Sequence, residues 1–423
     1  MLTKARALTN PTYKSETRVE VALLVSALFL QRFSLPFQRT FLALDILPVA
    51  FILLHQFLSG KLLIQLDRLL WFLAAAFAAT LSLALNFNGK MLTSYFLFLA
   101  LYSLVTLSKP CTLNQYKSTL QAFQFLIVVL SYLAVAQFAA QFIVDGRKLI
   151  MFFGILPDVL FGPLRGEMMN TIHPIEGSFL LKSNGLFLAE PSNLSQVTAL
   201  GILIEVLEFR RPRYLSIMVL GFLTAYSGVG MMILLIFLPL AALRDGRAGL
   251  SVLLVVASSA GVFATGLIDS NVFLSRVIEF ENTRASGFAR FISPLWLTVM
   301  HFDTASLQAL LVGKGPGTAR ELASITRWWA ANPSSWLKWL YEYGIIGSFL
   351  FVCLCASCLR RSRCPGLVLA ALILIEVFAA GFLTTWFLTI VITLCTLQSA
   401  EPRRVRADFL TRYPRPTPIL PAN

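Results

Sequence analysis

The sequence predicts an all-α fold, a polytopic transmembrane helix bundle of about 12 spans with two long extracytoplasmic loops. Of the 423 residues, 57% are hydrophobic and 13% are charged. Soluble domains have about 45–50% apolar and about 25% charged residues, so a soluble fold could not bury this much apolar surface. Apolar runs long enough to cross about 30 Å of hydrocarbon recur along the chain. Lys and Arg gather between alternate pairs of these runs, which is the pattern of cytoplasmic loops.

Five apolar runs make up a predicted N-terminal bundle, residues 1–144. They are 19–37, 40–59, 69–87, 91–107 and 119–144. A first long outer loop, 145–185, follows the last of them. Each run is read as one membrane-spanning helix, because about 20 residues at 1.5 Å per residue match the thickness of the hydrocarbon core.

The next region, 186–268, is a predicted four-span core. Its runs are 186–207, 214–227, 229–243 and 249–268. The middle two are continuous apart from Ser227-Gly228-Val229-Gly230, and this glycine-containing break predicts a tight hairpin between two short helices.

A second long outer loop, 269–335, leads to a predicted C-terminal region of three spans, 336–398. These spans are 336–359, 366–381 and 383–398, with Gly381 at the turn between the last two. Residues 399–423 are rich in Pro and Arg, which predicts a disordered cytoplasmic tail.

The basic residues set the predicted orientation. With both termini cytoplasmic, the inner segments hold 21 of the 35 Lys and Arg residues, whereas the short outer loops hold only Arg32, Arg39 and Lys90. The net charge of +14 would suggest nucleic acid on a soluble chain. Here topology accounts for most of the charge, so no nucleic-acid partner is expected.

The remaining basic residues lie in or beside the two long outer loops, which the positive-inside rule does not cover. Arginine binds phosphate oxygens through two parallel hydrogen bonds, so such loops suit a diphosphate headgroup. The plainer alternative is a set of solvated loop charges. The candidate residues of the first loop are Arg165, His173 and Lys182, with Glu190 just after it. Those of the second are Arg284, Arg290, His301, Lys314 and Arg320.

Other titratable side chains have competing interpretations. Asp45 and Glu376 fall within apolar runs, where an acid is a candidate for transport or substrate handling, or a buried hydrogen-bonded group. Four cysteines cluster between 353 and 364, but their spacing matches no paired CxxC site. We therefore expect neither a metal nor another cofactor.

Five short motifs occur in a characteristic order between about 180 and 350. They are GLFLAEPS at 185–192, SGVG at 227–230, SGFARFISP at 286–294, GKGPGT at 313–318 and LKWLYEYGIIG at 337–347. This order resembles the O-antigen polymerase and O-antigen ligase superfamily of bacterial inner membranes. The likeness is closest to the polymerases of exopolysaccharide and capsule repeat units.

The resemblance implies a lipid-linked glycosyltransferase whose donor is a glycan on undecaprenyl diphosphate. Arg290 and Lys182 would hold the diphosphate and stabilise charge on the leaving group, and Glu190 would orient or deprotonate the acceptor hydroxyl. The other basic candidates would bind substrate. A chain-length regulator and a flippase are the protein partners that the resemblance implies.

Two departures from the family pattern bear on the exact activity. Lys182 stands where an arginine is usual, and a lysine cannot bind phosphate through the bidentate hydrogen bonds of a guanidinium. Pro333-Ser334 stand where the ligases carry a His-Asn pair, so this chain lacks the general base that a ligase would be expected to have there. A repeat-unit polymerase is the leading hypothesis. A ligase, a lipid-linked oligosaccharide flippase or secondary transporter, and a non-catalytic assembly component are the alternatives.

Overall fold

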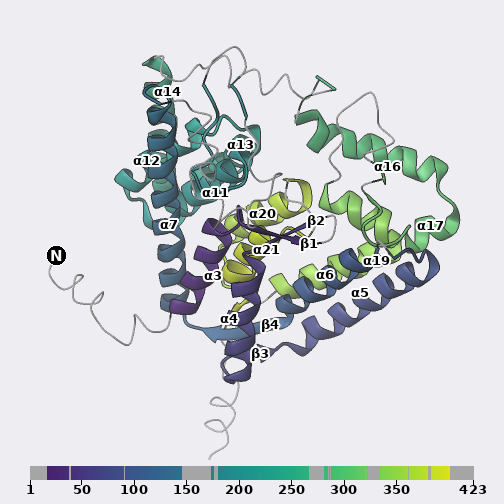
Figure 1. The fold of residues 1–423 in the computed structure, drawn as a ribbon. Helices are drawn as coiled ribbons and strands as arrows, with labels where there is room; N and C mark the ends of the chain where they lie inside the picture. Colours follow the sequence, from purple (N-terminus) through teal and green to yellow (C-terminus); the bar gives the residue numbers. More distant parts are fainter. Residues whose placement is uncertain are drawn as a thin grey trace, which may run out of the picture.

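The computed structural model describes residues 17–37, 40–89, 91–144, 173–175, 180–265, 281–283, 285, 287–319, 321–322, 334–360, 362–379 and 383–400. Within these ranges the protein is mostly helical (Figure 1). Three described helices are long and apolar enough to cross a membrane: α5 (Leu66–Leu85), α7 (Leu113–Ala140) and α19 (Ser335–Leu359). Each of the predicted spans contains a helix, but most of these helices are shorter. A bundle of 12 spans is therefore not confirmed.

The N-terminal region departs most from the all-α prediction. The helix expected over 19–37 is α3 (Arg18–Phe29), and the chain then forms a hairpin of β1 (Ser34–Phe37) and β2 (Thr40–Ala43). Pro36 lies in β1 and has no backbone N–H to continue a helix. The remaining helices of this region are α4 (Ile46–Leu58), α5, α6 (Met91–Ser103) with the 3-10 turn η1 (Leu104–Thr106), and α7.

A second small sheet ties distant parts of the chain together. β4 (Leu107–Cys111) lies between β3 (Leu63–Ile64), to which it is antiparallel, and β5 (Gln398–Ala400), to which it is parallel. Buried Arg68 lies nearby and donates to the backbone carbonyls of Val105 and Thr396. These long-range strand pairings are not visible as periodicity in a chain dominated by apolar runs.

The central region follows the prediction closely. Its helices are α11 (Pro191–Ile204) with the π-helical turn η4 (Glu205–Phe209), α12 (Pro212–Thr224), α13 (Gly228–Arg244) and α14 (Gly246–Ala264). The predicted break between 214–227 and 229–243 is confirmed as the end of α12 and the start of α13. A Cβ on Gly230 would lie 2.3 Å from the Ser195 carbonyl oxygen, so glycine permits the close packing of α13 on α11.

In the last region, the described residues 287–319 return to α19. This region contains the π-helical turn η5 (Phe288–Ile292), α16 (Ser293–Thr304) and α17 (Leu307–Val312). After α19 come α20 (Gly366–Leu374) with η6 (Ile375–Ala379), and α21 (Thr385–Val391) with η7 (Ile392–Thr396). Figure 1 shows α7 beside α11 and α12 on one side of the molecule, with α13 packed on α11, and α5 beside α19 on the other side. Each side has its own buried apolar cluster.

Candidate functional site

Two glutamines on α7 hold the segment that carries Lys182. Gln137 and Gln141 are one helical turn apart and therefore lie on the same face of α7. The Gln141 amide donates to the Leu181 carbonyl at 3.0 Å and accepts from its N–H at 2.7 Å. Gln137 Oε1 accepts from the hydroxyl of Ser183 at 2.6 Å. The backbone on both sides of Lys182 is thus anchored to a long rigid helix.

His173 reaches the same place through a short antiparallel pairing. The Lys182 N–H donates to the His173 carbonyl at 2.9 Å, and Pro174 and Leu181 form a β-bridge. Burial lowers the pKa of His173 below its ordinary value of 6.5, while Glu190 opposes this shift and Lys182 and Arg290 add to it. The environment of His173 thus favours the neutral imidazole.

The GLFLAEPS turn places Glu190 at the start of α11. Gln31 Oε1 accepts from the Ala189 N–H at 3.3 Å and from the Asn193 side chain at 3.0 Å. Fully buried Arg32 donates to the carbonyl of Leu186, whose φ of 67° lies in the left-handed region that non-glycine residues rarely adopt. Polar side chains just after α3 thus hold a strained turn in position.

Arg290 meets Glu190 across a separation of 100 residues. Its guanidinium donates to Glu190 Oε2 at 3.2 Å, and Ser192 Oγ donates to the same oxygen at 2.7 Å. Arg290 lies in the π-helical turn η5, a distortion that often marks functional positions. The contact uses a single terminal nitrogen, and among described residues Arg290 has no other hydrogen-bond or ion-pair partner.

The helices α11 and α13 both begin beside Glu190 and Lys182. Ser227, Gly228 and Val229 stand at the N-terminus of α13, and Pro191 and Ser192 at that of α11. The first backbone N–H groups of a helix have no partner within it, and the helix dipole places partial positive charge there. Helix N-termini are therefore favourable places for phosphate and other anions.

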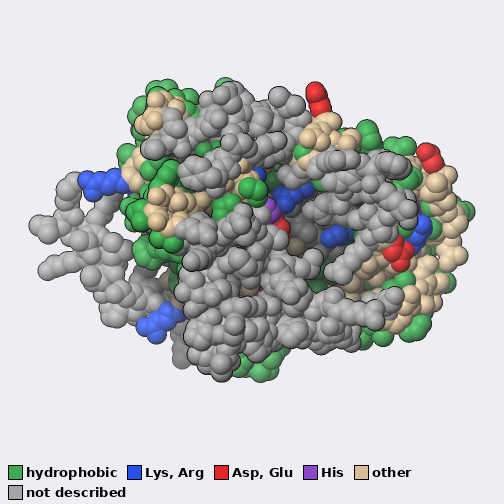
Figure 2. Space-filling view, turned by 45° about the horizontal axis from the view of Figure 1, so that its top comes forward, with side chains coloured by type: hydrophobic (Ala, Val, Ile, Leu, Met, Phe, Trp, Pro, Cys, Tyr) green, Lys and Arg blue, Asp and Glu red, His purple; other side chains and the backbone are tan. Residues whose placement is uncertain are grey.

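These segments enclose one pocket, with a cavity volume of about 110 Å³. This exceeds what a single water molecule requires several-fold. Figure 2 shows basic, acidic and histidine side chains gathered in a hollow, with hydrophobic side chains over much of the described surface around it. The residues that line the pocket are His173, Lys182, Glu190, Pro191, Ser192, Tyr226, Ser227, Gly228, Val229, Met231, Met232, Gly287, Arg290 and Phe291.

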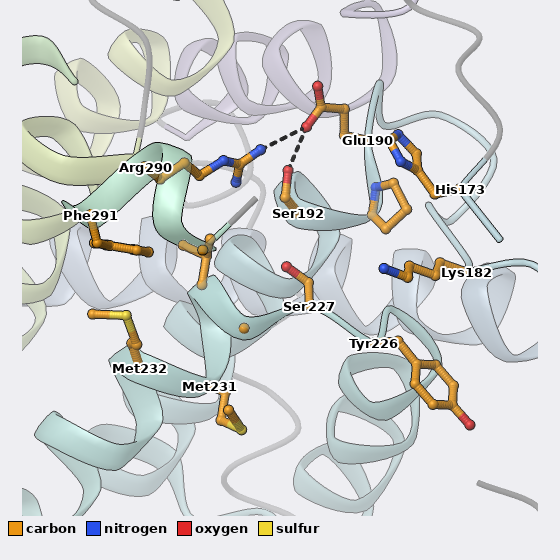
Figure 3. Close-up of a pocket in the computed structure, with 14 residues that line it drawn as sticks. His173, Lys182, Glu190, Ser192, Tyr226, Ser227, Met231, Met232, Arg290 and Phe291 are labelled. Atoms are coloured by element: carbon orange, nitrogen blue, oxygen red, sulfur yellow. Dashed lines mark hydrogen bonds and ion pairs between the residues drawn. The ribbon is translucent and has the colours of Figure 1, made fainter. Parts of the chain in front are cut away.

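The pocket is electrostatically suited to an anion. Among the described residues that line it, Lys182 and Arg290 are cationic and Glu190 is anionic, and both helix N-termini add partial positive charge. In Figure 3 the Lys182 ammonium and the Ser227 hydroxyl point into the space below Glu190, and the Tyr226 ring points away. Met232 and Phe291 form an apolar wall opposite Lys182.

Four of the predicted site residues therefore come together: Lys182, Glu190, Arg290 and His173. Three others, Arg165, Arg284 and Arg320, lie outside the described residues.

His301 and Lys314 do not line the pocket but lie against α19. The His301 ring is 4.9 Å from the Tyr341 ring, and the Lys314 ammonium is 4.9 Å from the centre of the same ring. His301 is 2% exposed, and neither of its ring nitrogens has a hydrogen-bond partner among described residues. Burial, with Lys314 adding to it, lowers the pKa of His301.

The GKGPGT motif forms a structural junction with α19. The N–H groups of Lys314 and Gly315 donate to the carbonyls of Tyr341 and Glu342 at 2.9 and 3.0 Å. A Cβ on Gly313, whose φ is 86°, would lie 2.3 Å from the Glu342 carbonyl oxygen. Gly344, with a φ of 67°, kinks α19 at the same contact. These backbone amides are thus occupied by the protein itself.

The two acids in apolar runs have hydrogen-bond donors. The Thr385 hydroxyl lies 2.6 and 2.8 Å from the two carboxylate oxygens of Asp45. The Tyr102 hydroxyl donates to Glu376 at 3.3 Å. Asp45 is buried and so matches the interpretation as a buried hydrogen-bonded group, whereas Glu376 is hydrogen-bonded but only half-buried.

Sequence reasoning missed the residues that support the pocket: Gln31, Arg32, Gln137 and Gln141. Two glutamines four residues apart inside the apolar run 119–144 were a usable signal, because they share a helix face. The glycine-containing break predicts a turn at Ser227, but nothing in the sequence indicates that this residue lines the pocket.

Among the described residues, no group of three or more His, Cys, Asp and Glu side chains could hold a metal ion. Comparisons of the chain with protein-family models, with curated proteins and with solved structures find no match.

Proposed function

We propose that this protein is a membrane glycosyltransferase that polymerises undecaprenyl-diphosphate-linked repeat units into a surface polysaccharide or exopolysaccharide. One observation carries the proposal. Lys182 and Glu190, from the segment that leads into α11, meet Arg290, which lies 100 residues after Glu190, in one pocket where α11 and α13 both begin. Two cationic side chains, two helix N-termini and one carboxylate are the groups that a diphosphate leaving group and an acceptor hydroxyl require.

A membrane location is part of the proposal, with about 12 spans in a bacterial inner membrane and both termini cytoplasmic. Besides the three long apolar helices, the described surface supports it. Large apolar side chains such as Phe77 and Leu243 are 71% and 84% exposed. Extended apolar surface on a protein marks contact with a membrane or a partner.

In the proposed reaction, the diphosphate of the donor binds at Arg290 and Lys182. The acceptor hydroxyl oxygen forms a bond to the anomeric carbon while the bond from that carbon to the diphosphate breaks. The departing diphosphate carries the electron pair, and its charge is stabilised by both cations and by the N-terminus of α13. The hydroxyl proton passes to Glu190 and then to solvent.

The ion pair seen between Glu190 and Arg290 has a role in this scheme. A carboxylate that bonds Arg290 at 3.2 Å occupies the place where a phosphate oxygen would bind. Diphosphate, with more negative charge, competes for the guanidinium and leaves Glu190 to face the acceptor hydroxyl. Binding of the donor and readiness of the base are thereby coupled.

The motifs divide into two groups by position. GLFLAEPS, SGVG and SGFARFISP contribute pocket residues, whereas GKGPGT and LKWLYEYGIIG brace one another at the kink of α19. The first three would handle substrate, and the last two would keep the second outer loop against the membrane domain. A flippase that supplies repeat units and a chain-length regulator are the partners that such an enzyme needs.

Deletion of the gene, followed by analysis of lipid-linked glycans, tests this function. Accumulation of single repeat units on the lipid carrier at the outer face supports the polymerase. Long polymer left on the carrier would indicate a ligase, and repeat units retained at the cytoplasmic face would indicate a flippase. Complementation with the wild-type gene must restore the polymer, and complementation with the Arg290→Ala variant must not.

A further inference from the structure

A second cavity, of about 300 Å³, lies among α6, α19, α20 and α21 with their adjoining turns η1, η6 and η7. Its wall is almost entirely carbon, from side chains such as Phe351, Leu372, Leu388 and Val391. It shares no lining residue and no helix with the pocket that contains Arg290. It is therefore a separate site.

Three of the polar side chains in this wall bond within the protein. The Tyr102 hydroxyl donates to Glu376 at 3.3 Å, and the Cys358 thiol lies 3.9 Å from the Val105 carbonyl. A cavity with an apolar wall of this kind does not hold ordered water, which needs two to four polar partners. Apolar molecules are the occupants that fit such a wall.

The cavity opens on the outer surface of the bundle. It is lined by Val352 of α19 and Ile373 of α20, which are 54% and 40% exposed. Phe349 of α19 and Phe378 of η6, the turn that follows α20, are further large apolar side chains exposed nearby in the chain. A hydrocarbon chain in the surrounding bilayer can thus reach the cavity between α19 and α20.

We propose that this cavity binds one acyl chain of a bilayer phospholipid as an integral part of the folded protein. An apolar wall that opens toward hydrocarbon would lose dispersion contacts if the space beside it stayed empty. An acyl chain is slender and lacks polar groups, and the bilayer supplies it at high concentration. The isoprenoid chain of the proposed substrate is the competing occupant, but none of the elements around the Arg290 pocket lines this cavity. The proposal rests on membrane embedding and not on glycosyl transfer.

Photo-crosslinking of the full-length protein in phospholipid vesicles tests the proposal. The probe is a phosphatidylethanolamine with a diazirine in the middle of one acyl chain, and adducts are mapped by mass spectrometry of peptides. The expected adducts lie in 351–359 and 369–377. Ala356→Trp, at the mouth of the cavity, should reduce them about tenfold, as for tenfold weaker occupancy. Leu235→Trp on the exposed face of α13 is the matched control and should leave them unchanged.

Several results would overturn the proposal. They are an absence of adducts in these segments, adducts that persist in Ala356→Trp, or labelling by a diazirine-bearing polyprenyl phosphate and not by the phospholipid. Val352→Trp, at an exposed position of the same mouth, gives an independent blocking variant if Ala356→Trp fails to fold. Polymer formation is scored separately on glycan gels, so failure of the glycosyltransferase assignment would remain distinguishable.

Discussion

Replacement of Arg290 should separate activity from stability. The only described partner of Arg290 is Glu190, whose side chain is 41% exposed, against 18% for Arg290 itself. An ion pair with that much solvent contact contributes about 0–1 kcal/mol to folding. Arg290→Ala should therefore leave the thermal unfolding temperature in detergent nearly unchanged. If Arg290 stabilises the departing diphosphate, its loss should slow the reaction about 10²- to 10³-fold, as for loss of one positioned donor.

The assay is polymer formation by the purified protein in vesicles, with lipid-linked repeat units as substrate and product length read on gels. Arg290→Lys keeps the charge but not the planar fork, so its rate should fall between those of the wild type and Arg290→Ala. Arg213→Ala, at an exposed position on α12, is the matched control and should react at the wild-type rate. A wild-type rate for Arg290→Ala would show that Arg290 does not stabilise the leaving group, and a rate loss matched by a loss of folded protein would show that its role is structural.

Three further predictions concern the supports of the site. Gln137→Leu removes the acceptor of the buried Ser183 hydroxyl and the Gly185 N–H, so the free energy of unfolding should fall by about 1–3 kcal/mol per unsatisfied group. Activity should also fall, because Lys182 shifts. Thermal unfolding measures the first effect and turnover the second. Gly313→Ala should destabilise the fold by about 1–3 kcal/mol because the backbone φ at this position is 86°, and by more if the contact with Glu342 cannot relax. The control is Gly249→Ala in α14, where an added Cβ meets nothing within 4 Å, and this change should be neutral or stabilising. Burial lowers the pKa of His301 in the folded state, so the unfolded chain binds more protons, and stability should decline as the pH falls below the ordinary histidine pKa of 6.5. Between pH 7.5 and 5 the unfolding temperature should therefore fall less in His301→Phe than in the wild type. The same pH dependence in both proteins would contradict this.

Helix positions were predictable because apolar runs of near-span length leave few alternatives. The hairpin at Ser227 was predictable because glycines interrupt an otherwise continuous run. The end of α3 at Phe29 was not, since the apolar residues that follow it enter a β-hairpin instead of prolonging the helix. The lengths of the apolar runs leave the number of spans a prediction, since three of the described helices are long and apolar enough to cross a membrane.

The candidate site was predictable in its chemistry and less so in its membership. Motif order singled out Lys182, Glu190 and Arg290, and these three do meet in one pocket. His301 and Lys314 carry the same charge types in the same loop, yet α16 and the glycine loop pack back on α19 and take both residues elsewhere. Composition cannot distinguish these outcomes, because contacts over 100 residues of sequence depend on the packing of the whole fold.

The proposed function requires that the pocket at Arg290 bind diphosphate on a lipid carrier. The deciding measurement is direct binding of undecaprenyl diphosphate, undecaprenyl phosphate and undecaprenol to the purified protein. We expect affinity to fall in the order diphosphate, monophosphate, alcohol, with weaker diphosphate binding in Arg290→Ala and tighter binding in Glu190→Gln, which no longer competes for the guanidinium as an anion. Equal affinities for the three lipids, or diphosphate binding indifferent to both substitutions, would contradict it.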